Sequence, residues 1–238
     1  MIVEADSTAL EWRVAVFLSQ DRVGLQEILD GVDPHALNKE RFGLPERVIA
    51  KVFLFRLIYG GNAYSYAHDS DFMHVSTKEK YWQKIIDQTY EKYQDLYQWH
   101  QKIKETVRRT GQLVIPSGRV FKYSPKPNGD WPDTIILNYP VQGFSADLMM
   151  LARIAIYRRL ISYCDKGILL VNTVHDSILV DCKPGQVDFV CRTMKDVFKG
   201  LAETASQCFR IVFNVPMDCK IKVGPNWGNM EEWNEIQS

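Results

Sequence analysis

Residues 47–61 read RVIAKVFLFRLIYGG, and within this stretch Arg47, Lys51, Phe55 and Tyr59 recur at steps of four residues. Four residues turn a helix by about 400°, so successive side chains drift by only about 40° and form one stripe. The two cations come first, near the helix N-terminus, where the free amides and the helix dipole favour anions. The two aromatic faces that follow can pack against a sugar and a base. The stripe therefore predicts a helix that binds a nucleoside triphosphate.

Two carboxylates extend this interpretation. Asp6 follows the strand-like run at residues 2–5, and Asp176 follows His175 in a predicted tight hairpin between two β-rich runs. Carboxylates at the ends of adjacent strands can hold two divalent ions roughly 3.5–4 Å apart, as two-metal phosphoryl-transfer sites do. Taken singly, the stripe is also an ordinary amphipathic helix, and each Asp is also an ordinary strand-end or turn residue. Taken together, they predict nucleotidyl transfer.

The composition is that of a globular protein. The 238 residues are 46% hydrophobic and 24% charged, which is enough to bury one sizeable core or two small ones. The sequence lacks the apolar run of about 18 residues that a transmembrane helix needs, and its N-terminus lacks the features of a signal peptide. Five cysteines without a CxxC pair predict reduced thiols. We therefore expect a cytoplasmic protein that does not bind membranes, located in the host cytoplasm if a phage encodes it.

The order of periodic segments predicts an α+β fold, because helices are segregated from strands. Helices are predicted at residues 8–19, 45–59, 76–111, 144–162 and 187–209, and strands at 2–5, 168–174, 178–180, 211–213 and 221–223. Ser7 is a predicted N-cap, and Ser76–Glu79 is a predicted capping box. The proline-rich stretch from Pro116 to Pro140 is predicted to be a loop with short strands at most.

Four motifs in register resemble one family over nearly the whole chain. They are Asp6 with Glu11 and Arg13 at +5 and +7, Arg47-x3-Lys51-x3-Phe55-x3-Tyr59-Gly60, Asn138-Tyr-Pro-Val-Gln142-Gly143, and Val174-His175-Asp176. These resemble the first palm motif, the fingers helix, the Asn…Gln-Gly segment and the second palm motif of the family A, DNA polymerase I-like DNA polymerases. The resemblance implies an antiparallel palm sheet with packed helices and an inserted, mainly helical fingers region. The implied domains are palm at 1–32, fingers at 33–125 and palm at 126–238.

The resemblance also implies roles at the reacting centre. Asp6, Asp176 and the Ser7 carbonyl would hold two magnesium ions, for which manganese can substitute. Arg47 and Lys51 would bind the triphosphate of a dNTP, and Lys51 would also donate a proton to pyrophosphate.

Further residues would select the sugar and line the DNA. Phe55 would pack under the sugar, while Glu11 and Tyr59 would form a gate against a ribose 2′-hydroxyl. His175 would approach the primer terminus. The residues implied to line the primer–template track are Arg13, Arg119, Asn138 and Gln142.

Two departures from the family pattern affect what we expect. Ser177 stands where the family usually has Glu, which predicts looser metal positioning with the chemistry retained. The chain begins within a few residues of Asp6, so we expect the thumb and the 3′–5′ exonuclease to reside on a separate polypeptide, with a shortened form of a longer chain as the alternative. The balance of 29 basic and 29 acidic residues agrees, since a protein that grips duplex DNA alone usually has a basic surplus.

Two other functions remain open. One is a single-subunit RNA polymerase, against which Glu11 and Phe55 argue, because a carboxylate at position 11 would clash with a 2′-hydroxyl. The other is a non-catalytic nucleic-acid-binding subunit that retains the fold. The absence of Glu at position 177 is the only feature that favours it.

Overall fold

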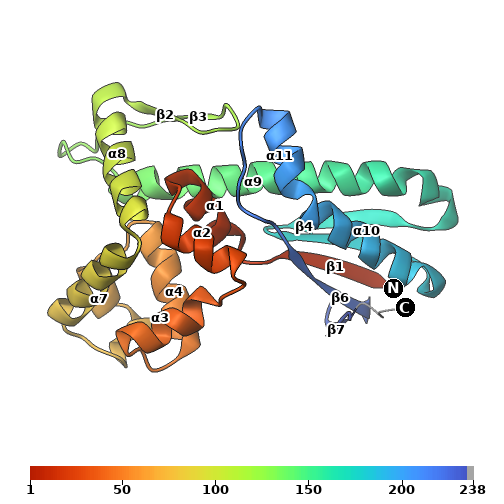
Figure 1. Ribbon diagram of the computed structural model, residues 1–238, viewed down its shortest axis with the longest axis horizontal. Helices are drawn as coiled ribbons and strands as arrows, with labels where there is room; N and C mark the ends of the chain where they lie inside the picture. The colour runs from red at the N-terminus through yellow and green to blue at the C-terminus, as the bar shows by residue number, and fades with distance from the viewer. Residues whose placement is uncertain (235–238) are drawn as a thin grey trace. The chain divides into compact units, whose positions relative to one another are not determined.

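The computed structural model describes residues 1–234, which form two compact units (Figure 1). The first unit joins Met1–Leu10 to the chain from Phe144 onward, and the second is Glu11–Gly143. The first unit is thus discontinuous in sequence, with the second inserted into it. The predicted palm–fingers boundaries, at 32/33 and 125/126, differ from the ends of these compact units. The division into palm and fingers stays a prediction.

An antiparallel sheet forms the first unit, with strand order β4-β5-β1-β6-β7. Its strands are β1 (Ile2–Ser7), β4 (Leu169–Val174), β5 (Ser177–Asp181), β6 (Cys219–Asn226) and β7 (Asn229–Glu232). Asp6 pairs with Ser177 on one side and with Lys220 on the other. The central strand is therefore the one that carries Asp6.

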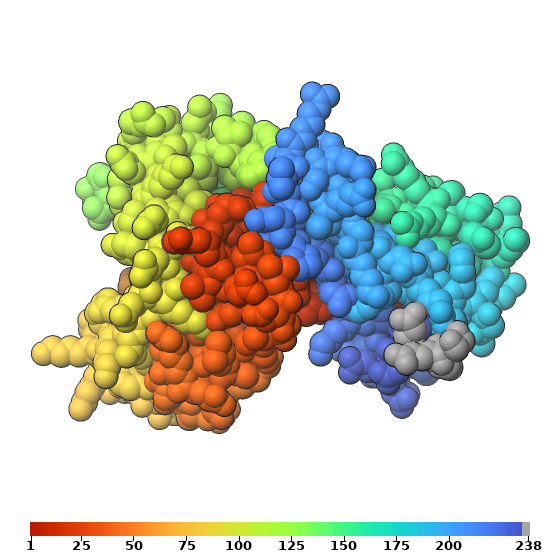
Figure 2. Space-filling view, viewed as in Figure 1, coloured from red at the N-terminus to blue at the C-terminus, as the bar shows by residue number. Residues whose placement is uncertain are grey.

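Helix α10 (Val187–Lys199) covers one face of this sheet, and α11 (Leu201–Phe209) follows it and contacts it; both are drawn in blue in Figure 2. Helix α10 contacts both β1 and β6, and on this side Val3, Ala5 and Cys219 are fully buried. The period of two along a strand sends the intervening side chains to the opposite face. On that face Asp6 is half-buried and Lys222 is exposed.

The second unit is mainly helical. Its helices are α1 (Leu10–Ser19), α2 (Arg22–Leu29), α3 (Pro34–Phe42), α4 (Arg47–Ile58), α5 (Ala63–Ala67), α6 (Ser70–Met73), α7 (Glu79–Lys92) and α8 (Gln94–Thr110). A small hairpin follows, made of β2 (Gln112–Val114) and β3 (Val120–Lys122). Helix α9 (Asp133–Leu160) begins in this unit and continues into the first. Short 3₁₀ turns lie at Ile161–Lys166 and Pro184–Gln186.

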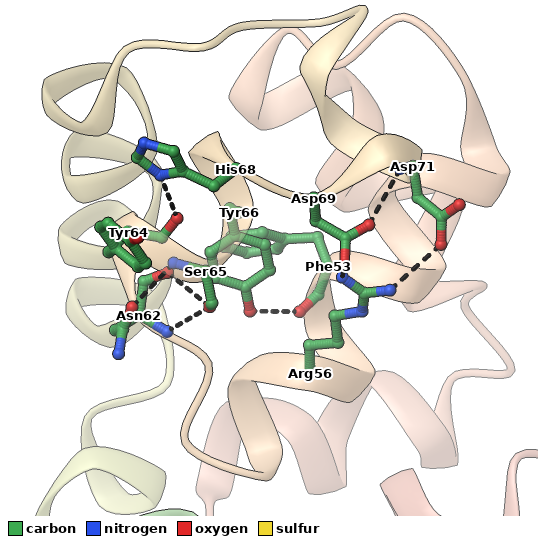
Figure 3. A network of polar contacts seen from close by, with 9 residues as sticks. All are labelled: Phe53, Arg56, Asn62, Tyr64, Ser65, Tyr66, His68, Asp69 and Asp71. Carbon is green, nitrogen blue, oxygen red and sulfur yellow. Dashed lines mark hydrogen bonds and ion pairs between the residues drawn. The ribbon is translucent and has the colours of Figure 1, made fainter.

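An aromatic core holds α4 against α5, α6 and α7, and a polar clamp reinforces it (Figure 3). Arg56 of α4 pairs through Nη1 with Asp69 at 2.6 Å and through Nη2 with Asp71 at 3.1 Å. Its guanidinium lies 4.9 Å from the ring centroid of Phe72. The buried Tyr66 hydroxyl donates to a backbone carbonyl of α4 at 2.9 Å. The helix that carries the Arg47–Tyr59 stripe is thus packed on the side away from its exposed cations, Arg47 and Lys51.

Two predicted helix starts are wrong. Ser7 lies inside β1, and α1 begins only at Leu10, so Ser7 is no N-cap. The capping box at Ser76–Glu79 does not form, because α7 is preceded by Lys78 without a side-chain cap bond. Ser7 belongs to a strand and Ser76 to the segment before α7, although the local pattern placed both at the start of a helix.

The loop predicted up to Pro140 is also wrong, because α9 begins at Asp133 and contains Pro140. Proline removes one backbone hydrogen bond from a helix. Burial of Ile136, Val141 and Phe144, each fully enclosed, offsets that loss, since packing of an apolar face supplies most helix stability in proteins.

The long predicted helices are interrupted. The stretch predicted at 76–111 divides at Tyr93, and the stretch at 187–209 divides at Gly200. The strand predicted at 211–213 is absent from the structure, whereas the hairpin around His175 is confirmed. Among residues 1–234, the helices are too short or too polar to cross a membrane.

Candidate active site

The two predicted metal carboxylates lie in the first unit, one on β1 and the other in the turn before the neighbouring strand β5. Asp6 is in β1, and His175 and Asp176 form the two-residue turn between β4 and β5. His175 has a φ of 51°, as two-residue hairpin turns require at a central position. The Ser7 amide donates to the Asp176 carbonyl at 2.9 Å. The strand that carries Asp6 is therefore hydrogen-bonded directly to the turn that carries Asp176.

The charges at this point of the sheet repel each other. Burial and the neighbouring Asp176 carboxylate raise the pKa of Asp6 above its ordinary value, while the Ser177 hydroxyl lowers it. Ser177 Oγ donates to Asp6 Oδ2 at 3.0 Å, so the residue that replaces the family's Glu orients the carboxylate instead of adding a charge. A bound cation would relieve this repulsion.

The donors present suit magnesium. Magnesium prefers oxygen ligands and usually takes one or two carboxylates together with waters and substrate phosphates. Asp6 and Asp176 supply two such carboxylates, and within residues 1–234 no group of three or more His, Cys, Asp or Glu side chains is placed to hold an ion. Two carboxylates therefore suit an ion whose coordination shell is completed by substrate and water, rather than an ion bound by protein ligands alone. The implied Ser7 carbonyl ligand stays a prediction.

The predicted nucleotide-binding stripe lies in the second unit, with Arg47, Lys51 and Phe55 on α4 and Tyr59 directly after it. Arg47 and Lys51 are exposed, and Phe55 is half-buried. Arg47 Nε pairs with Asp33 Oδ2 at 2.6 Å, and Lys51 Nζ lies 5.7 Å from the Phe55 ring centroid. Each cation is therefore held near the helix by a weak neighbour contact that an anionic ligand can replace.

His35 lies beside this stripe, and the stripe pattern alone does not include it. Its ring centroid is 5.8 Å from that of Phe55. Burial, helped by Arg47 and Lys51 and opposed by Asp33, lowers the pKa of His35 to about 4, so the imidazole is neutral at pH 7. Its Nδ1 is buried without a hydrogen-bond partner among the described residues. The sequence signal is the segment Asp33-Pro-His35, which opens α3.

Three residues far apart in sequence meet at the end of α4. Tyr59 is the residue that ends this helix, Glu11 comes from α1, and Gln142 comes from α9. Burial raises the pKa of the Tyr59 hydroxyl well above its ordinary value, Glu11 raises it further, and Gln142 lowers it. The predicted gate pair, Glu11 and Tyr59, is thus adjacent within the second unit.

The residue after Gln142 has to be small. A Cβ on Gly143 would lie 2.5 Å from Cζ of Phe121 and 3.4 Å from Cδ of Arg119. Helix α9 therefore approaches Phe121 of β3 closely at this point, and Arg119 lies beside Gly143. Arg13 and Asn138, the other predicted DNA-lining residues of this unit, are half-buried. Contact of these residues with DNA stays a prediction.

An antiparallel sheet that carries a half-buried carboxylate pair, interrupted by an inserted helical unit with the Arg47–Tyr59 stripe, defines a polymerase-type nucleotidyltransferase fold. Residues 1–229 match the family described as DNA polymerase family A, and the chain belongs to that family.

The individual relatives agree. The chain is 25% identical over 246 residues to the thermostable DNA polymerase I of Thermus aquaticus, covering 98% of this chain and 27% of that protein. It is 26% identical over 240 residues to the DNA polymerase I of Caldicellulosiruptor bescii, covering 95% and 26%. The chain therefore spans about a quarter of the length of these relatives.

A solved structure confirms the predicted fold. The POL domain of Pol1 from M. smegmatis, in complex with DNA primer-template and dNTP, superposes with a TM-score of 0.78 at 20% identity. The match covers 95% of this chain and 40% of that chain.

Proposed function

We propose that this chain is the palm and fingers part of a template-directed DNA polymerase, which transfers a nucleotide from a dNTP to a primer 3′-hydroxyl. The observation that carries the proposal is the carboxylate pair: Asp6 lies on β1, Asp176 lies in the turn before the neighbouring strand β5, and the two charges repel each other. Membership of DNA polymerase family A supports it.

Each residue of the reacting centre has one role in this proposal. Asp6 and Asp176, with the Ser7 carbonyl, hold two magnesium or manganese ions. When bound, these ions supply activation of the primer hydroxyl and neutralisation of the departing pyrophosphate. Arg47 and Lys51 bind the triphosphate, and Lys51 donates a proton to the pyrophosphate as it leaves.

The remaining residues select the nucleotide and position the DNA. Phe55 packs under the sugar, and Glu11 with Tyr59 excludes a 2′-hydroxyl by occupying its space. The residues proposed to contact primer or template are Arg13, Arg119, Asn138, Gln142 and His175.

We also propose that a second polypeptide supplies a thumb, with or without a 3′–5′ exonuclease. The chain has a formal net charge of zero, whereas binding of duplex DNA depends on cations that neutralise phosphates. Primer extension by this chain alone is then weak, and addition of the partner restores it. A cytoplasmic location is part of the same proposal.

The central experiment is single-nucleotide primer extension with the protein in excess over the primer–template. Asp176→Ala should abolish measurable extension without changing the circular dichroism spectrum. Asp165→Ala, which changes an exposed carboxylate of the same unit, is the matched control and should extend like the wild type. Persistent extension by Asp176→Ala would refute the metal assignment.

Comparison of dATP with ATP in this assay distinguishes the remaining alternatives. Preference for ATP would indicate an RNA polymerase. A wild-type chain that binds primer–template but extends nothing, with or without the partner, would indicate a non-catalytic subunit.

A further inference from the structure

The C-terminal half of α9, which belongs to the first unit (Figure 1), is apolar on two sides. Its inner side is buried in that unit, and the enclosed side chains are Leu148, Ala152, Ile156 and Leu160. Its outer side carries four apolar side chains that are 37–51% exposed, namely Met150, Ile154, Tyr157 and, directly after the helix, Ile161. A helix that is apolar all round is normally covered on every side. These four residues form the α9 stripe, an apolar face that residues 1–234 leave uncovered.

The α9 stripe has the spacing of a helix-packing surface. Its members follow one another at steps of four, three and four residues. At about 100° per residue, their side chains fall within about 60° of the helix circumference. Helices pack along each other through apolar side chains at this spacing. The stripe is therefore suited to a second helix.

Arginines border the stripe on both sides. Arg153 and Arg158 each lie about 40° beyond one edge of it. Nη2 of Arg153 donates to Met150 Sδ at 2.8 Å, and Arg158 is exposed. The sequence from 148 to 164 contains no Asp or Glu. Charges that border an apolar helix seam select a partner of the opposite sign, so the complementary partner is acidic.

A second copy of this chain is a poorer match than an acidic helix. Two stripes packed antiparallel about their common centre bring Ile154 of one copy opposite Tyr157 of the other. The same alignment brings Arg153 opposite Arg158, and a parallel alignment brings equivalent arginines together, so like charges repel in both. DNA is also a poor match, because the centre of the stripe is apolar, whereas protein–DNA interfaces are polar and strongly positive.

We propose that the α9 stripe is the docking site for an acidic amphipathic helix of the second polypeptide. That helix lays its apolar side on the stripe and places Glu or Asp side chains beside Arg153 and Arg158. This docking site rests on the proposed function, to which it adds the surface that joins the two polypeptides.

The test measures binding of a fluorescein-labelled helical peptide to the full chain by fluorescence anisotropy. The acidic peptide has leucines at alternating four- and three-residue steps with Glu on both flanks, and a basic version replaces every Glu with Lys. At low salt the acidic peptide should bind about tenfold or more tightly than the basic one, and the difference should shrink at high KCl concentration. Tyr157→Glu should weaken binding of the acidic peptide about tenfold or more, because an aromatic anchor becomes a charge.

Two further variants make the test specific. Val212→Glu places the same charge on a side chain of the same unit that is 84% exposed and lies outside α9, and it should bind the acidic peptide like the wild type. The double variant Arg153→Glu with Arg158→Glu should reverse the preference and bind the basic peptide more tightly. A reversed preference cannot come from a variant that fails to fold.

Several results would refute the docking site. They are an absence of binding of both peptides, equal binding of both, and a loss in Val212→Glu as large as in Tyr157→Glu. A wild-type chain that dimerises in sedimentation equilibrium while Tyr157→Glu stays monomeric would assign the stripe to a second copy. Loss of duplex DNA binding in Tyr157→Glu but not in Val212→Glu would assign it to DNA.

Single-nucleotide primer extension by the same preparations separates this site from the proposed function. Extension by a chain that does not bind the acidic peptide refutes the docking site and leaves the proposed function standing. An absence of extension, with the partner present, refutes the proposed function even if the peptide binds.

Discussion

A buried ion pair in the second unit gives the sharpest prediction about stability. Lys92 Nζ lies 2.7 Å from Glu27 Oε1, with side-chain exposures of only 7% and 10%. The Tyr93 hydroxyl donates to Glu27 Oε2 at 2.8 Å, and Lys92 donates to Asn38 at 2.8 Å. Tyr93 in turn packs edge-on against Trp12, with ring centroids 4.9 Å apart. The network therefore supports the helix that carries the proposed gate and primer residues.

Replacement Glu27→Gln leaves the buried Lys92 charge without its partner. Breaking a buried pair in this way typically costs about 3–5 kcal/mol. We expect about 3 kcal/mol here, because Lys92 can lose its proton. Burial already lowers the pKa of Lys92, against the raising effect of Glu27, and loss of Glu27 lowers this pKa further.

The sign of the pH dependence follows from that shift. With a pKa below its value in the unfolded chain, Lys92 binds more protons in the unfolded state, so stability rises with pH. The cost of Glu27→Gln should therefore be largest near neutral pH and shrink as pH approaches about 10.4, the ordinary pKa of lysine.

The assay is urea unfolding at several pH values, followed by the near-ultraviolet circular dichroism of the buried aromatic side chains. Arg22→Gln is the control, because Arg22 pairs with Asp95 at the surface with 83% of its side chain exposed. Such pairs contribute about 0–1 kcal/mol. A loss for Glu27→Gln no larger than that of the control, or a loss that grows with pH, would contradict the reasoning.

Three further predictions concern the site. Gly143→Ala should cost about 1–3 kcal/mol of unfolding free energy, because its methyl would overlap the Phe121 ring, and Phe121→Leu should recover part of it in thermal melts. Ser177→Ala removes a hydrogen bond that lowers the pKa of Asp6, so the acidic limb of the pH–rate profile should move to higher pH. Glu11→Ala should raise the ratio of ATP to dATP incorporation by about 10–100-fold.

Each of these three has a simple contradiction. Gly185→Ala, with open space around the new methyl group, is the control for Gly143→Ala, and equal melting temperatures would refute the packing argument. An acidic limb that stays in place would show that Asp6 does not govern it. An unchanged nucleotide ratio would remove Glu11 from the gate.

Local sequence patterns predicted the elements that neighbouring residues specify by themselves. The stripe on α4 follows from the four-residue spacing of its cations and aromatic residues. The end of this helix follows from Gly60, which adopts a positive φ of 82° directly after it. The hairpin at His175 follows from β-rich runs on either side of a short turn. In both cases the local preference and the packed structure agree.

Local patterns could not predict the elements and contacts that depend on packing between distant parts of the chain. Pro140 marks a loop by local preference, yet its neighbours are buried and the helix continues. The encounter of Glu11, Tyr59 and Gln142 could be expected only from the family resemblance, because no spacing in the chain relates them. The pair of Lys92 and Glu27 likewise becomes visible only when α2 and α7 are packed together.

The most direct test of the account is incorporation of single dNTPs opposite each of the four template bases, with the protein in excess and the proposed partner present. The account predicts product only for the matching dNTP, and none for Asp6→Asn, whose circular dichroism spectrum should equal that of the wild type. Incorporation that ignores the template base, or that survives in Asp6→Asn, would contradict it.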